Sequence, residues 1–349
     1  MELDLLLRAV LGPAAASAAA LVALRLLAAW LAAPRAAGDS THSTHPARRA
    51  RIARALASPL WLAPLLAVPP IAAFIHQEGE FTWPPLLAFG WLPVAIALAG
   101  VLAPALLFPD AARRGASARA DADPPAVAHA PQGGDTPAWG LATGGCALLA
   151  IVSMVVLPAP GHADGVSRLV AAAIAAVAAC GAACVARRPG IAGFVAPWGC
   201  AAALSAMALL GGFIKLAVIL GALSATSAGF AVLARWLRLA PGAAGAAAFA
   251  CILAACAFLG MGYDERHMPV WSWAIVALAP AAGSLAALPA IARRPRLEWM
   301  VRAGAPIAVA ALGVACGALL APAPAQEEQE VPDAYRSLGA RSVAPAHLG

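Results

Sequence analysis

Ten long stretches of apolar residues occupy most of the chain and leave few places for charge. A helix that crosses a bilayer needs about 20 mostly apolar residues. Ten segments come close to that length, and they cover residues 9–33, 56–75, 86–108, 138–157, 167–186, 191–210, 213–234, 243–262, 270–290 and 303–321. Because a span in lipid must satisfy its own backbone polar groups, each segment is expected to be helical. The sequence therefore predicts an all-α, polytopic transmembrane helical bundle over residues 1–321.

Charge is too scarce for a soluble protein of this length. Only 11% of the 349 residues are charged and 62% are apolar, whereas a soluble domain carries about 25% charged residues. Such a chain cannot cover its surface with polar groups, which argues strongly against a soluble enzyme. We expect the lipid bilayer to be its main environment, in the cytoplasmic (inner) membrane.

The basic residues predict how the bundle is oriented. Cytoplasmic loops of membrane proteins carry an excess of Lys and Arg. With ten spans and both termini extracytoplasmic, sixteen of the 23 basic residues lie on the cytoplasmic side, six lie outside and Arg25 falls within a span. Arg302 is counted among the cytoplasmic sixteen. The net charge of +6 is thus read as an orientation signal. We expect no nucleic-acid partner, because the arginines do not form one basic face or tail.

Two polar stretches lie outside the predicted spans. Residues 109–137 contain several Asp, Pro and Gly residues and are expected to form a flexible cytoplasmic loop. Residues 322–349 contain clustered Gln and Glu and are expected to form a disordered extracytoplasmic tail.

The 17 carboxylates all lie outside the ten predicted spans. Carriers driven by protons or cations keep acidic or histidine side chains at membrane depth, where they bind the coupling ion. The sequence therefore argues against ion-coupled transport. Two cations near or inside spans, Arg25 and Lys215, are the candidate substrate-binding residues, although either side chain can instead extend along its helix toward the interface.

A second candidate site lies in the predicted outer loops, where histidines occur near acids. His76 is close to Glu78, His162 is close to Asp164, and His267 is close to Asp264. Imidazole and carboxylate groups are ligands for Zn²⁺ and can act as acids and bases. If the loops converge, these six residues predict a divalent-metal site. The alternative is that they are ordinary polar loop residues, with no cofactor.

Hydroxyl and proline residues within the spans can have either a structural or a functional role. Ser224, Thr226 and Ser227 are expected to bond the preceding-turn carbonyl or a neighbouring helix. The prolines at 59, 64, 69 and 70 predict irregular backbone that lines a cavity, or else kinks tolerated by packing.

Three functions are compatible with these features. The first is a permease-like or lipid-handling protein for an apolar or weakly polar solute, without ion coupling. The second is a non-catalytic subunit or scaffold of a membrane complex, which requires a membrane-protein partner. The third is a membrane enzyme with the His/carboxylate site on its outer face. The sequence favours the first over the second by little, and favours the enzyme least.

Overall fold

The computed structural model describes residues 6–33, 52–53, 55–79, 84–85, 87–107, 136–158, 165–186, 190–237 and 239–322. All elements in these ranges are helices. The first half contains the π-helix η1 (Leu6–Leu11), α2 (Gly12–Ala32), η2 (Pro59–Trp61), α4 (Leu62–Glu78), η3 (Ala88–Trp91), α5 (Leu92–Leu107), α7 (Thr136–Val156) and α8 (Gly165–Val185). The second half contains α9 (Ala192–Leu210), α10 (Ile214–Leu237), α11 (Gly242–Gly262), α12 (Val270–Ala282), η4 (Gly283–Ala287), α13 (Pro289–Ala292) and α14 (Pro295–Leu320).

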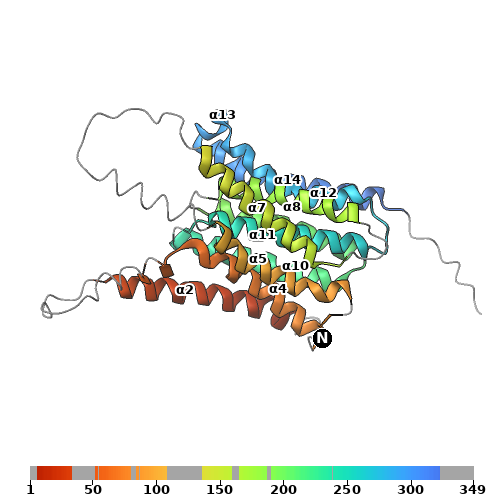
Figure 1. The fold of residues 1–349 in the computed structure, drawn as a ribbon, viewed down its shortest axis with the longest axis horizontal. Coiled ribbons are helices and arrows are strands. Elements are labelled where there is room, and N and C mark those ends of the chain that lie inside the picture. Colours follow the sequence, from red (N-terminus) through yellow and green to blue (C-terminus); the bar gives the residue numbers. More distant parts are fainter. Residues whose placement is uncertain are drawn as a thin grey trace, which may run out of the picture.

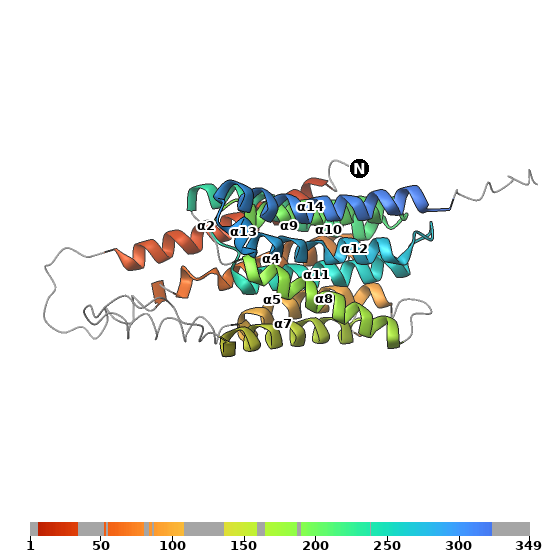
Figure 2. The ribbon, with the colours of Figure 1, turned by 90° about the horizontal axis from the view of Figure 1, so that it is seen from above.

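The long helices lie roughly side by side along one direction and form a bundle (Figures 1 and 2). Nine helices among the described residues are long and apolar enough to cross a membrane, and α7 contributes a shorter described apolar stretch, Thr143–Val156. The protein is therefore a multi-pass helical membrane bundle. Each of the ten predicted segments coincides with one of these helices, while the count of ten spans and the orientation stay predictions.

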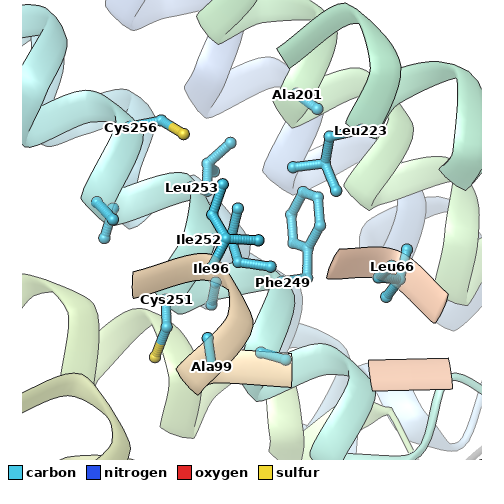
Figure 3. Close-up of a cluster of buried hydrophobic side chains, with 14 of the residues drawn as sticks. Leu66, Ile96, Ala99, Ala201, Leu223, Phe249, Cys251, Ile252, Leu253 and Cys256 are labelled. Atoms are coloured by element: carbon cyan, nitrogen blue, oxygen red, sulfur yellow. The ribbon is translucent and has the colours of Figure 1, made fainter. Parts of the chain in front are cut away.

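Helix α11 forms the centre of the bundle. Every residue from Ala244 to Gly260 is buried, and α11 contacts helices on all sides, including α4, α5, α7, α8 and α12. A helix that is apolar around its whole circumference is expected to be buried in this way. Side chains from several helices meet around Phe249, Ile252 and Leu253 of α11 (Figure 3).

Small residues allow the helix backbones to approach closely. A Cβ atom at Gly181 of α8 would lie 2.7 Å from the Cα of Ala281 in α12, so only glycine fits at this crossing. Close backbone approach through small residues is a common way for membrane helices to associate.

Helices α9 and α10 form a hairpin of two full-length helices. The turn is made by Gly211 and Gly212, and Gly212 has φ +83°, a conformation that glycine adopts readily. Ser224 Oγ donates to the carbonyl of Trp198 on the neighbouring helix at 3.2 Å. Thr226 and Ser227 donate to preceding-turn carbonyls, at 2.7 and 3.0 Å. The expectation for these three hydroxyls is confirmed.

The last helix is longer than the last predicted span. Helix α14 begins at Pro295, with Glu298 in its first turn, whereas the predicted span starts at residue 303. Pro is well suited to the first turn of a helix. Glu298 and Arg302 are one turn apart and form an ion pair with an N–O distance of 4.0 Å. Arg302, expected in a loop, is therefore a buried residue of the bundle, 5% exposed.

The bundle has two ends, the Asp264 end and the Arg302 end. At the Asp264 end, α4 ends, α9 turns into α10, and residues 263–269 join α11 to α12. At the Arg302 end, α8 ends, α11 begins, and α14 begins. The predicted orientation puts the Asp264 end outside. Two predicted polar stretches lie largely outside the described residues. Of the predicted tail 322–349, only Pro322 is described. Of the predicted loop 109–137, only the last two residues are described, and they belong to α7.

Candidate functional site

The larger of the two described cavities lies near the Asp264 end, between α8, α11 and α12, and it opens to the surface of the bundle, where Val166, Val170 and Val270 of its lining are exposed. Its volume is about 220 Å³. The lining is almost wholly apolar and includes Val170, Ala171 and Ile174 of α8, Ala254, Ala257, Phe258 and Met261 of α11, and Trp273, Ala274 and Ala277 of α12. Ser167 of α8 is the polar residue of the described lining. Apolar cavities of about 150 Å³ bind benzene, so this one has room for a small apolar molecule or part of a longer one.

Trp273 is the largest side chain of that lining and is held in place from outside the cavity. Its indole Nε1 donates to Asp264 Oδ2 at 3.2 Å. The same carboxylate accepts from the backbone N–H of Met268 at 2.7 Å and of Arg266 at 3.0 Å. Asp264 is buried, so its charge is compensated by these three donors.

Three hydrogen bonds fix the carboxylate of Asp264. Both carboxylate oxygens already accept hydrogen bonds, and the bonds close the turn of residues 264–268. His267 has φ +53° and is exposed. Within the described part of the chain, no group of three or more His, Cys, Asp or Glu side chains is arranged to hold a metal ion. His162 and Asp164 lie outside the described residues, so the full six-residue metal site stays a prediction.

The other two outer-loop candidates lie on α4. His76 is exposed. Glu78 pairs with Lys215, the candidate substrate-binding cation at the start of α10, with a distance of 2.7 Å between Lys215 Nζ and Glu78 Oε1. Two residues predicted for different sites thus bind each other at the Asp264 end, 137 positions apart in the chain.

Four aromatic rings connect the helices at the same end. Phe74 of α4 packs on Phe89 of η3 with ring centroids 5.1 Å apart. Phe89 packs on Phe213, and Phe213 on Tyr263, each at 5.0 Å. The N–H of Glu265 also donates to the carbonyl of Gly211 at 3.0 Å. These contacts fix the 263–269 loop against the α9–α10 turn.

Arg25 lies on α2 and lines neither of the two described cavities. Its side chain is partly buried, and it forms no hydrogen bond or ion pair with another described residue. Neither cavity is lined by α4, the helix whose prolines predicted irregular, cavity-lining backbone. Pro69 and Pro70 lie inside a continuous helix, which favours the alternative of kinks tolerated by packing.

A smaller cavity, of about 40 Å³, lies at the Arg302 end. Four prolines line it: Pro197 of α9, Pro241 before α11, Pro280 of α12 and Pro306 of α14. Arg302 supplies the charged group of the lining. A cavity of this size has room for a few water molecules at most.

Both features that sequence reasoning missed depend on residues brought together by the fold. The Trp273–Asp264 bond joins α12 to the preceding loop, and the large cavity combines residues from three helices. Tryptophans near helix ends commonly lie at the membrane interface, so the position of Trp273 in the sequence does not indicate this bond. Comparison of the chain with protein-family models and with curated proteins found no match.

Proposed function

We propose that the protein binds an apolar or weakly polar molecule within the membrane, as a permease-like or lipid-handling protein without ion coupling. The observation that carries this proposal is the cavity of about 220 Å³ between α8, α11 and α12. Its apolar lining suits a hydrocarbon. Ligand sites are generally concave and apolar with few polar groups.

The charge distribution supports the absence of ion coupling. The described linings of both cavities contain no carboxylate or histidine. A coupling ion inside the membrane requires such ligands. The buried acid nearest the large cavity, Asp264, is bonded to two backbone N–H groups and to Trp273.

The proposed function also concerns the location and orientation of the protein in the membrane. We infer ten spans in the cytoplasmic membrane with both termini outside, from the distribution of the basic residues. The large cavity then lies in the outer half of the bilayer. Its occupant would enter from the outer leaflet.

The test is equilibrium binding of tritiated n-decanol to the full chain in mild detergent. Ala171 lines the cavity, whereas Ala173, two residues along α8, is exposed and does not. Ala171→Phe should lower the affinity about tenfold or more, because a filled pocket excludes its ligand, and Ala173→Phe should leave it unchanged. Thermal unfolding verifies that both variants fold.

Two results would overturn the proposal. One is equal binding of n-decanol to the wild type and to both variants, which would show that the alcohol only joins the detergent shell. The other is flux of n-decanol into proteoliposomes that requires a pH or sodium gradient. Native mass spectrometry of the same sample reports a bound metal or a stoichiometric partner, and so identifies the enzyme or scaffold alternative.

A further inference from the structure

We infer that Trp273 sets the size of the molecule that the large cavity admits, and that Asp264 positions Trp273 for this role. The inference rests on the proposed function and adds the residue that determines specificity. Trp273 is 2% exposed and is one of only two aromatic side chains in the cavity lining, with Phe258.

The indole ring is fixed on two sides. On one side it lies against the backbone of α11 at Gly260, where a Cβ atom would overlap the ring. On the other side its Nε1 donates to Asp264 Oδ2. With the ring edge and its N–H both held, Trp273 forms a fixed wall of the cavity.

Asp264 links that position to the 263–269 loop. Its carboxylate accepts from the N–H groups of Arg266 and Met268 as well as from Trp273. Hydrogen bonds to a carboxylate are stronger than those between neutral groups, so the carboxylate holds the loop and the ring together. Asp264 touches no ligand in the cavity and acts through Trp273 alone.

The ligand class follows from this arrangement. Since the indole N–H is already bonded to Asp264, Trp273 presents only carbon to the cavity. The remaining lining is apolar apart from Ser167. The site therefore takes a molecule with one hydrocarbon part of limited size and at most one small polar group.

The experiment is competition between tritiated n-decanol and unlabelled n-alkyl alcohols of increasing chain length. Trp273→Phe shortens the ring and removes the N–H donor while keeping an aromatic side chain, so the fold is retained. It should raise the affinity for the longest alcohols relative to the shortest about tenfold. Trp271→Phe is the matched control, because Trp271 lies on the same helix, is 46% exposed and does not line the cavity, and its chain-length profile should equal that of the wild type.

The positioning role of Asp264 is tested in the same assay. Asp264→Ala should broaden the chain-length profile, and the double variant Asp264→Ala/Trp273→Phe should match Trp273→Phe alone, because the carboxylate acts through the ring. Additive shifts would overturn the positioning role. An unchanged profile in Trp273→Phe would overturn the size limit while leaving the proposed function intact. Failure of the wild type to bind n-decanol would remove the proposed function itself.

Discussion

The Nζ atom of Lys215 lies 2.7 Å from Oε1 of Glu78 and joins the start of α10 to the end of α4. A substrate anion at Lys215 would share the ammonium group with this carboxylate. The pair is partly exposed, at 54% for the Lys215 side chain and 29% for that of Glu78. The contribution of this ion pair to stability is therefore better measured by a double-mutant cycle than by a single substitution.

A double-mutant cycle of Glu78→Gln and Lys215→Met should give a coupling free energy below about 1 kcal/mol, because solvent screens exposed ion pairs. Thermal unfolding in detergent measures it, and added salt should reduce it further. If Lys215→Met instead abolishes n-decanol binding, Lys215 is a ligand-binding residue as the sequence predicted.

Removal of the Asp264 carboxylate should destabilise the protein. Asp264→Ala leaves the donors of Met268, Arg266 and Trp273 without their acceptor, and we expect a loss of roughly 2–4 kcal/mol in the free energy of unfolding. Glu265→Ala, next in the chain and exposed, should cost far less. Chelation by EDTA tests whether Asp264 binds a metal. If EDTA lowers the melting temperature of the wild type but not that of Asp264→Ala, this carboxylate is a metal ligand.

The ion pair of α14 should contribute to stability although its atoms are 4.0 Å apart. Removing one partner of a tight buried pair costs about 3–5 kcal/mol, and the longer distance here lowers the expected cost of Glu298→Gln to roughly 1–3 kcal/mol. Arg296→Gln is the control, because Arg296 is exposed in the first turn of the same helix. Equal unfolding curves for the two variants would show that Glu298 contributes nothing to the fold.

The helix crossing at Gly181 should not tolerate a side chain. Gly181→Ala places a methyl group against the backbone of Ala281, and overpacking of this kind costs about 1–3 kcal/mol. Gly304→Ala meets no atom within 4 Å and should be neutral or stabilising by up to about 1 kcal/mol, because alanine favours the helix. A stabilised Gly181→Ala variant would contradict this packing.

The orientation can be tested by reporter fusions at residues 125, 163 and 265. A reporter active in the cytoplasm should work at residue 125, and one active outside should work at residues 163 and 265. A cytoplasmic signal at residue 265 would place the Asp264 end inside and reverse the topology inferred from the arginines.

Hydropathy was sufficient to predict the helical bundle, because lipid imposes one length and one kind of backbone on every span. It also located α11, whose ends differ from the predicted segment 243–262 by at most one residue. It could not predict how α14 starts. The charges of residues 293–302 resemble a loop in sequence, but Pro295 begins a helix and Glu298 pairs with Arg302.

The candidate site was less accessible to sequence reasoning for a physical reason. Asp264 and Lys215 were selected for their charge, yet the partners of each are set by tertiary packing: Trp273 for one and Glu78 for the other. The cavity itself has no sequence motif, since alanine and valine line it and also fill the core. Only the arrangement of α8, α11 and α12 distinguishes the alanine and valine residues that line the cavity from those that fill the core.

The central position of α11 has a consequence for biosynthesis. The helix is made after α4 to α10 but before α12, and it contacts helices on both sides of it in the chain. Until α12 leaves the ribosome and inserts, the face of α11 that α12 covers must remain against lipid or against the insertion machinery. Completion of the bundle therefore waits for the last quarter of the chain, and a protein cut short after residue 262 would leave its most buried helix partly uncovered.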